Sequence, residues 1–329
     1  MRETQKKIWN ALLLSAVLVT VVWVWKSNPK LEEAARREYA REYARYSANT
    51  PDAFVEEGEE PLIAPLYPTF ENISGLTTME DLRRYVYMVD ETAYVTPQDL
   101  DIQHFLATDM STDLSGNEPK ILIYHTHSRE TFADSRPGAE EDTIVGVGRA
   151  LAEILSQQYH IPVVHDRGRY DMVNGKEKRE GSYERMEPAV RSVLERFPSI
   201  EVTIDLHRDG VPENVRLACE INGVPTARIM MFNGITCLNQ KGRPKAMPDL
   251  VNPYLTENFA LSLQMLLTGN ELYPGLMRKN YIKAYRYGLH LAPKAMLVEV
   301  GANTNTLQEA KNAMTPFAEI LTWVLQRRD

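Results

Sequence analysis

The sequence predicts an α/β protein, arranged as a three-layer sandwich in which helices flank a mainly parallel sheet. From Glu118 onwards, short apolar runs rich in β-branched residues alternate with longer segments of helical periodicity. This alternation is typical of parallel strands joined by helices that cover both faces of a sheet. Three of the apolar runs also end in histidine or carboxylate residues, which is where open α/β sheets bind their ligands.

The first element is a predicted transmembrane helix at Ile8–Trp25. It consists of 18 consecutive residues without a charge, which is long enough to span a bilayer. Tryptophans lie near both ends, and Arg2, Lys6 and Lys7 favour a cytoplasmic N-terminus. We therefore expect a single-pass protein of the cell membrane whose remaining chain is extracytoplasmic. A cleaved signal peptide is the alternative, although no small-x-small cleavage site closes the apolar run.

The chain divides into four predicted parts. Residues 1–26 are the cytoplasmic start and the anchor, and residues 27–74 are a spacer, first charged and then interrupted by prolines. Residues 75–116 are a small N-terminal arm or subdomain that begins with a helix capped by Thr78. Residues 117–329 form the domain that carries the chemistry.

The last domain supplies the predicted sheet and its covering helices. The expected strands are KILIYH, IPVVHD, EVTIDLH and AMLVEVG. The expected helices are Ile144–Tyr159, EPAVRSVLERF, ENFALSLQMLL and the terminal segment LQEAKNAMTPFAEILTWVLQ. The terminal segment is predicted to be one long helix that Pro316 bends, because an interior proline removes a helix hydrogen bond.

Composition excludes some classes of partner. A formal net charge of −8 and the lack of a basic stripe argue against nucleic-acid binding. The two cysteines, Cys219 and Cys237, are too few and too far apart for a zinc finger or a CxxC redox motif. They form either a disulfide in an oxidising compartment or two free thiols.

The polar residues at three predicted strand ends match a hydrolytic zinc site. Zinc of this kind takes three ligands from histidine and carboxylate and leaves a fourth position for water. His127 and Glu130 have HxxE spacing, and His207 follows another strand, so these three are the predicted Zn²⁺ ligands. The ion would lower the pKa of its water, and Glu299 would carry the proton to the leaving nitrogen.

Several further residues have supporting or open roles. HxxE alone occurs by chance in many chains, so it is the coincidence of three strand ends that favours the site. An acid from the segment after Glu130 is an alternative carboxylate ligand, although acids there also suit the start of a helix. Those acids are Glu140, Glu141 and Asp142. Ligand-orienting or substrate-binding roles are expected for His125, Arg129, Arg208, Asp209 and Arg278, and substrate contact for Arg216 and Asn258.

Taken in order, IYHTHSRETF, SIEVTIDLHRDG, YPGLMRK and MLVEVGANTNTLQEA resemble the stage II sporulation protein P family. The resemblance covers roughly Glu118 to the end. It implies a cell-wall amidase fold and a zinc-dependent N-acetylmuramoyl-L-alanine amidase that cleaves stem peptides from peptidoglycan during engulfment in sporulation. It also implies partnership with the stage II sporulation proteins D, a lytic transglycosylase, and M, a membrane protein. Some members are also credited with cutting peptide crosslinks.

Two stretches depart from the family pattern. Tyr287, Gly288 and Leu289 stand where an Asn-Gln pair is expected before the last strand, and Ile144 stands where an asparagine often opens the first long helix. Neither departure removes a predicted zinc ligand. Two other functions stay open: a zinc carboxypeptidase or endopeptidase on wall peptides, and a wall-binding scaffold without catalysis.

Overall fold

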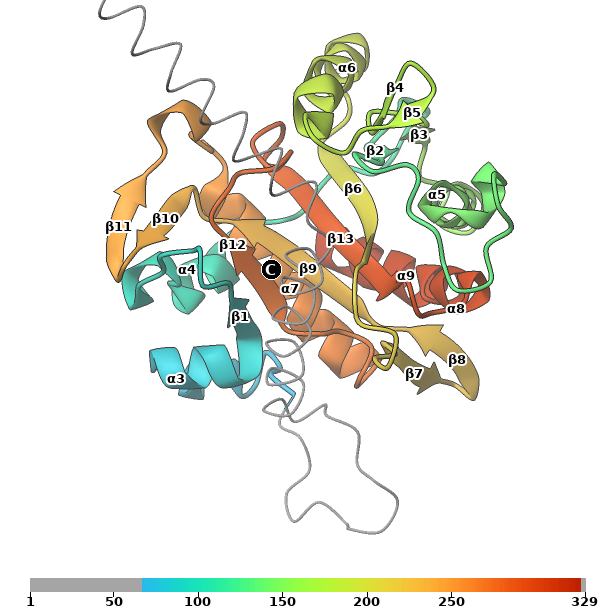
Figure 1. Cartoon of the computed structure of the whole chain (residues 1–329). Coiled ribbons are helices and arrows are strands. Elements are labelled where there is room, and N and C mark those ends of the chain that lie inside the picture. The colour runs from blue at the N-terminus through green and yellow to red at the C-terminus, as the bar shows by residue number, and fades with distance from the viewer. Residues whose placement is uncertain (1–66, 327–329) are drawn as a thin grey trace, which may run out of the picture. The chain divides into compact units, whose positions relative to one another are not determined.

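A seven-stranded sheet with the order β1-β12-β9-β13-β6-β2-β3 is the centre of the structure (Figure 1). The computed structural model describes residues 67–326. Within this sheet all neighbouring strands are parallel except β9 and β13, which are antiparallel. The strands are β1 (Tyr87–Val89), β12 (Asn280–Lys283), β9 (Ile229–Gly234), β13 (Lys294–Ala302), β6 (Val202–Asp209), β2 (Ile121–Tyr124) and β3 (Val163–His165). The predicted α/β class with a mostly parallel sheet is therefore confirmed.

Three antiparallel hairpins that the sequence reasoning did not predict extend from this sheet. Each has a tight turn with an Asn-Gly or Lys-Gly pair in the left-handed region, which is the turn chemistry that two-residue hairpins favour. Their strands are β4 (Met172–Val173) with β5 (Lys176–Glu177), β7 (Ala218–Ile221) with β8 (Val224–Ala227), and β10 (Cys237–Gln240) with β11 (Arg243–Ala246).

Helices cover both faces of the sheet. They are α3 (Met79–Asp81), α4 (Ile102–Ala107), α5 (Ile144–Gln157), α6 (Ser182–Arg196), α7 (Leu255–Leu272), α8 (Leu307–Asn312) and α9 (Met314–Gln326). Helix α9 contacts both α5 and α7 on one face, and α6 packs on the other (Figure 1). The predicted helices Ile144–Tyr159 and ENFALSLQMLL are present as α5 and α7.

Strand β2 shows how the two faces are divided. Its successive side chains point to opposite sides, as the period of two requires. Ile121 and Ile123 belong to the large core beneath α5, α7 and α9. Leu122 and Tyr124 pack instead with Met186 and Val190 of α6. Because all four residues of β2 are buried, the strand is fixed from both faces and its carboxyl end is held in place.

The segment that was predicted to be one terminal helix forms two helices, and the predicted bend at Pro316 is wrong. The break lies at Ala313, between α8 and α9. Pro316 is the third residue of α9, in the first turn, where a missing backbone N–H leaves no helix hydrogen bond unmade. Thr306 and Glu309 form a capping box at the start of α8, so this helix is bounded by its own signals.

The segment before the chemical domain contributes an edge strand to the same sheet. Thr78 accepts a hydrogen bond from Asp81 N and caps α3 as expected. The chain then enters β1, which pairs in parallel with β12. The predicted anchor Ile8–Trp25 and most of the predicted spacer lie outside the described residues. Across residues 67–326, none of the helices combines the length and the apolar character that crossing a bilayer requires.

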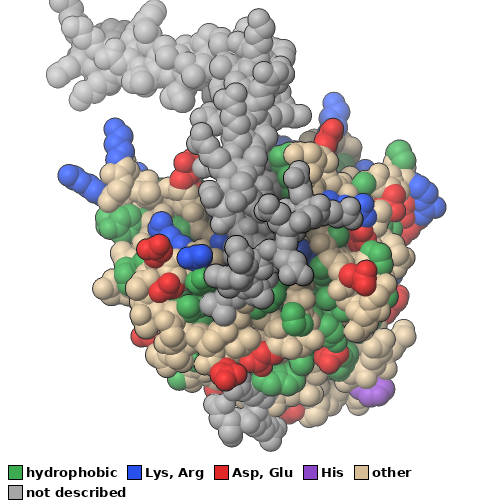
Figure 2. Space-filling view, turned by 90° about the horizontal axis from the view of Figure 1, so that it is seen from below, with side chains coloured by type: hydrophobic (Ala, Val, Ile, Leu, Met, Phe, Trp, Pro, Cys, Tyr) green, Lys and Arg blue, Asp and Glu red, His purple; other side chains and the backbone are tan. Residues whose placement is uncertain are grey.

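The described surface carries scattered rather than gathered apolar groups. The exposed large hydrophobic residues are Val224, Val251, Leu272, Tyr285 and Trp323. Figure 2 shows one face, on which hydrophobic side chains lie in small groups between charged side chains of both signs. Such scatter is ordinary for a protein surface. Cys219 and Cys237 are free thiols in this structure, so the disulfide alternative is not formed.

Candidate active site

Three strands bring the candidate residues to one edge of the sheet. His125 follows the end of β2, His207 lies near the carboxyl end of β6, and Glu299 lies in β13. Glu299 and His207 are direct partners in the register of the parallel pair β13 and β6. Tyr124 pairs with Asp205 in the same way across β2 and β6. Register therefore places residues that are far apart in sequence beside one another, as the strand-end argument predicts.

Two pairwise contacts link the predicted zinc ligands. His207 Nδ1 is 3.4 Å from Glu130 Oε2, and both side chains are buried. The rings of His127 and His207 have centroids 5.3 Å apart and are nearly perpendicular, at 78°. His127 is half-buried, and its Nδ1 is buried without a hydrogen-bond partner among the described residues. Burial lowers the pKa of His127 to about 4, so its imidazole is neutral near pH 7, which is the form that binds metals.

Asp205 orients His207, and the sequence reasoning missed it. Its Oδ1 lies 2.7 Å from His207 Nε2, although the ring N–H is not aligned for a regular hydrogen bond. Thr126 holds the same carboxylate through its backbone N–H, at 2.9 Å, and its hydroxyl, at 2.6 Å. A carboxylate behind a histidine is the usual arrangement around metal-binding imidazoles. The signal in the sequence was the buried carboxylate in VTIDLH, two residues before the histidine and therefore on the same face of β6.

Glu130 accepts hydrogen bonds through both oxygens. Arg179 Nη2 donates to Oε1 at 2.6 Å, and the backbone N–H of Arg208 donates to Oε2 at 2.9 Å. Burial alone would raise the pKa of Glu130, but His207 and Arg208 outweigh it and hold the pKa at about 2. Glu130 is therefore a carboxylate at neutral pH. Arg179 is a second residue that the sequence reasoning missed, because it reaches the site from 49 positions away.

Glu299 has the opposite electrostatic environment. Burial, together with the nearby negative charge of Asp209, raises the pKa of Glu299 to about 8. Its Oε2 has no hydrogen-bond partner among the described residues. Asp209 is itself paired with the buried Arg278, whose Nη1 is 2.9 Å from Asp209 Oδ2. A carboxyl group with this pKa can both accept and donate a proton near neutral pH.

His207 lies between two carboxylates. Burial lowers the pKa of His207, but Asp205 and Glu130 outweigh that effect and raise it well above the usual value. The position between Asp205 and Glu130 therefore favours positive charge, either as a proton on the ring or as a cation bound to it.

His125 has no open nitrogen and supports the site from behind. Its Nδ1 lies 2.8 Å from Leu206 O, and its Nε2 lies 2.9 Å from His165 Nε2. If Nδ1 donates to the carbonyl, Nε2 must accept from His165, so the two rings have a matched tautomer. His125 thus connects β2 and β3 to the backbone next to His207. His165 of β3 is part of this chain of contacts.

The alternative carboxylate ligands are engaged elsewhere. Glu140 pairs with Arg167 and Arg169, and both Glu141 and Asp142 pair with Arg136. Arg129 is half-buried in the loop after His127, where its backbone N–H donates to Asp171 Oδ2 at 2.9 Å. Among the four acids considered as the carboxylate ligand, Glu130 is therefore the one that lies beside His207.

Two of the predicted substrate contacts have structural partners. Arg216 pairs with Glu309 at the start of α8. Asn258 is buried, and its amide donates to Pro293 O and Ala295 O, at 3.1 and 3.2 Å. The expectation that Asn258 contacts substrate is therefore wrong, because its side chain fastens the start of β13 to α7.

The nitrogen and oxygen atoms of His127, Glu130 and His207 are suitable zinc ligands, although the three side chains do not surround a common point. Within residues 67–326, no three His, Cys, Asp or Glu side chains are arranged as a bound metal ion would hold them. The distance between two of the proposed ligand atoms nevertheless fits a zinc site. Two ligands that each lie roughly 2.0–2.1 Å from a tetrahedral zinc are about 3.3 Å apart. The separation of 3.4 Å between His207 Nδ1 and Glu130 Oε2 matches that edge, and His127 offers an unpartnered ring nitrogen.

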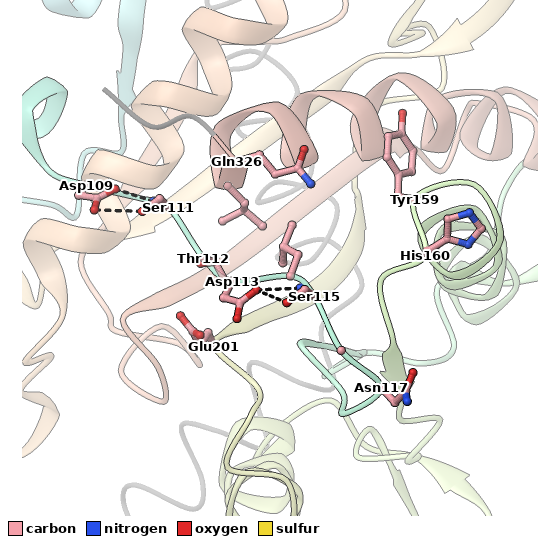
Figure 3. Close-up of a pocket in the computed structure, with 13 residues that line it drawn as sticks. Asp109, Ser111, Thr112, Asp113, Ser115, Asn117, Tyr159, His160, Glu201 and Gln326 are labelled. Atoms are coloured by element: carbon pink, nitrogen blue, oxygen red, sulfur yellow. Dashed lines mark hydrogen bonds between the residues drawn. The ribbon is translucent and has the colours of Figure 1, made fainter.

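A cavity of about 1140 Å³ lies away from these residues (Figure 3). Its lining includes the segment that precedes β2 and Glu201, which precedes β6, so it is at the amino ends of the strands. Asp109 and Asp113 turn back to accept hydrogen bonds from Ser111 and Ser115 (Figure 3). None of the candidate active-site residues lines this cavity.

The fold and the site define an α/β protein with a histidine–carboxylate site at the carboxyl ends of its sheet. The chain belongs to the stage II sporulation protein P family, whose model matches residues 34–322. Stage II sporulation protein P of Bacillus subtilis (strain 168) is 22% identical over 229 residues, which are 65% of this chain and 53% of that protein. The chain thus spans about half the length of this curated relative.

Solved structures of amidases are similar to part of this chain. N-acetylmuramoyl-L-alanine amidase AmiC2 of Nostoc punctiforme is 14% identical, with a TM-score of 0.35, and covers 64% of this chain and 97% of its own. The CwlD amidase from Clostridioides difficile, in complex with the GerS lipoprotein, is 14% identical, with a TM-score of 0.36, and covers 63% and 94%.

Proposed function

We propose that this protein is a zinc-dependent N-acetylmuramoyl-L-alanine amidase that removes stem peptides from peptidoglycan during sporulation. The observation that carries the proposal is the position of His207. It lies between Glu130 and Asp205, near His127, and next to Glu299 in the strand register. Two imidazoles and a carboxylate, with a separate carboxyl group of raised pKa, are what metal-assisted amide hydrolysis requires.

The proposed roles follow from the contacts. His127, Glu130 and His207 would hold zinc, which would supply a Lewis acid that polarises the amide carbonyl and lowers the pKa of water. Asp205 fixes the ring of His207, and Arg179 and the Arg208 N–H keep Glu130 ionised and in place. Each of these contacts reduces the freedom of a ligand before substrate arrives.

Glu299 would move the proton. With a pKa raised to about 8 by burial and by Asp209, its carboxylate form would take a proton from water, whose hydroxide bonds to the lactyl carbonyl carbon, and would then pass the proton to the leaving nitrogen. Arg278 pairs with Asp209 and sets how strongly that negative charge acts on Glu299. The bond that breaks is the amide between the lactyl group of N-acetylmuramic acid and L-alanine.

The setting of the enzyme is part of the proposal. We place the anchor at Ile8–Trp25 in the cell membrane, with residues 27–74 as a spacer and the catalytic residues outside the cytoplasm. Peptidoglycan is then the accessible substrate. The stage II sporulation proteins D and M are the proposed partners, through the family to which the chain belongs.

Product analysis tests the proposed function. Crosslinked peptidoglycan is incubated with the full chain in detergent, with and without a chelator, and the soluble products are identified by mass. Intact stem peptides together with glycan that carries free lactyl groups are expected, and their release should stop with chelator and return with zinc. Shortened stem peptides would indicate a zinc peptidase instead. Wall binding without release, even with the transglycosylase partner added, would indicate a scaffold.

A further inference from the structure

A row of aromatic rings leads away from the candidate active site. The ring of Tyr183, at the start of α6, lies 5.8 Å from that of His127. Tyr287 follows at 5.4 Å from Tyr183, and Phe232 of β9 at 4.8 Å from Tyr287. Phe232 is buried and anchors the row, whereas Tyr183 and Tyr287 are half-buried. We call these three residues, Tyr183, Tyr287 and Phe232, the aromatic row.

Tyr287 has a backbone conformation that a tyrosine rarely adopts. Its φ is +52°, in the region that glycine and asparagine occupy readily and bulky side chains avoid. It is the first central residue of a turn closed by the hydrogen bond from Leu289 N to Arg286 O, at 3.1 Å. The next residue, Gly288, leaves no room for a side chain, because an added Cβ would lie 2.5 Å from Tyr124 Oη. The turn is therefore pressed against the end of β2, and the Tyr287 ring is held at the site.

Strain of this kind identifies Tyr287 as a functional candidate. A residue in a sparsely populated backbone region is kept where the surrounding structure needs its side chain, and such residues gather at ligand sites. The Tyr287 ring packs against the buried cluster that contains Phe232 and Leu289, yet the residue is only half-buried. Packing therefore accounts for only part of the ring.

Guanidinium groups lie next to Glu130. Arg179 pairs with Glu130, and Arg208 Nε donates to Thr131 O, the carbonyl of the next residue. The aromatic row begins at the ring of His127. A peptidoglycan amide has a stem peptide with carboxylates on one side and uncharged sugar rings with apolar faces on the other. Charge complementarity assigns the peptide to the arginines and the sugar to the rings.

We propose that Tyr183 and Tyr287 form a subsite that binds a sugar ring of the glycan strand, with Tyr287 as the specificity-determining residue. This inference deepens the proposed function and depends on it for the identity of the substrate. The two half-buried rings offer flat apolar faces, and Phe232 packs against Tyr287, so little side-chain freedom is lost when the sugar binds.

Binding of peptide-free glycan tests this subsite without any hydrolysis. Titration calorimetry compares wild type, Tyr287→Asn, Tyr287→Phe and the control Tyr285→Ala, in the full chain. Tyr285 is exposed and lies outside the aromatic row. Tyr287→Asn should weaken binding on the order of tenfold, as expected for the loss of a packed ring, while the phenylalanine and control variants should bind like wild type. Because asparagine tolerates a positive φ, relief of backbone strain should offset part of the packing lost with the ring, and a cooperative thermal unfolding transition should show that this variant is folded.

Two outcomes would overturn the subsite. One is equal glycan affinity for wild type and Tyr287→Asn, and the other is no measurable binding by wild type. A kinetic comparison adds a second readout: Tyr287→Asn should raise KM for a disaccharide-peptide and leave KM unchanged for a lactyl-peptide without sugar. Equal increases on both substrates would place the ring against the peptide and contradict the proposal. Failure of wild type to release peptide from zinc-loaded assays would instead contradict the amidase function, whatever the glycan affinity.

Discussion

At the scale of single residues, the candidate active site depends on carboxylates in contrasting environments. Glu130 is buried and Glu299 is half-buried, yet hydrogen bonds and positive neighbours hold the pKa of the first at about 2, while desolvation and Asp209 raise that of the second to about 8. Opposed pKa values in one site separate a permanent ligand from a proton carrier. The sequence reasoning assigned these two roles from strand ends, and the electrostatics supply a physical basis for the assignment.

Asp205→Asn should weaken zinc binding about 10- to 100-fold, because the carboxylate behind His207 would lose its charge while Thr126 could still donate to the amide oxygen. Competition with a fluorescent zinc chelator measures this. Asp171→Asn is the matched control: Asp171 is also a buried carboxylate held by the same loop, through Ser128 Oγ and Arg129 N, but it does not contact a proposed ligand. Equal zinc affinities for both variants would contradict the role of Asp205.

At the scale of elements, the turn after β13 keeps Glu299 in position. Asn305 is fully buried there: its Oδ1 accepts from Ala302 N, and its Nδ2 donates to Leu217 O and Glu309 Oε2. Gly301, with φ of +59°, leaves the space that the Asn305 amide occupies, since an added Cβ would lie 2.8 Å from its Oδ1. One side chain thus connects the end of β13, the strand β7 region and the cap of α8.

Asn305→Ala should lower the free energy of unfolding by about 2–4 kcal/mol, because a buried N–H and a buried carbonyl would lose their partners. Urea unfolding of the full chain gives this value. Asn312→Ala is the control, since its amide donates to Pro225 O at an exposed position and should change stability by only about 0.5 kcal/mol. A similar small change for Asn305→Ala would show that the turn does not depend on this side chain.

Removal of a buried hydroxyl in the edge strand β1 should not lower the stability of the protein, in contrast to Asn305→Ala. Tyr87 is fully buried, and its Oη has no hydrogen-bond partner among the described residues. Tyr87→Phe should therefore leave stability unchanged or raise it by about 1 kcal/mol, because an unpaired hydroxyl is costly to bury. In the neighbouring strand β12, Tyr281→Phe should destabilise, since Tyr281 Oη donates to Asp90 Oδ2 at 2.6 Å. Thermal unfolding compares the two; destabilisation by Tyr87→Phe would reveal a buried water bound to the hydroxyl.

At the scale of the whole molecule, the sequence predicted the parts that depend on local patterns. Apolar runs with polar ends identified β2, β6 and β13, and through them His127, His207 and Glu299. What local pattern could not supply is long-range pairing. The contacts of Arg179 with Glu130 and of His165 with His125 join segments 49 and 40 residues apart, and the antiparallel step between β9 and β13 depends on the path of the chain between them.

Helix ends show a second limit. Pro316 was expected to bend one long helix, but the position of a proline within the helix decides its effect, and here it lies in the first turn of α9. Tyr287 shows a third limit of prediction from sequence. Its departure from the family pattern is visible in the sequence, whereas its positive φ and its place in the aromatic row are visible only in the structure.

The most direct test of the account is the variant Glu299→Gln in the full chain, with bound zinc and peptide release measured on the same preparation. Glutamine keeps the size of the side chain but cannot carry the proton, and Glu299 is not a proposed ligand. We predict that zinc content equals that of wild type and that stem-peptide release falls by about 10²- to 10⁴-fold. Release at the wild-type rate with zinc retained would contradict the role of Glu299, and loss of zinc would place this residue among the ligands instead.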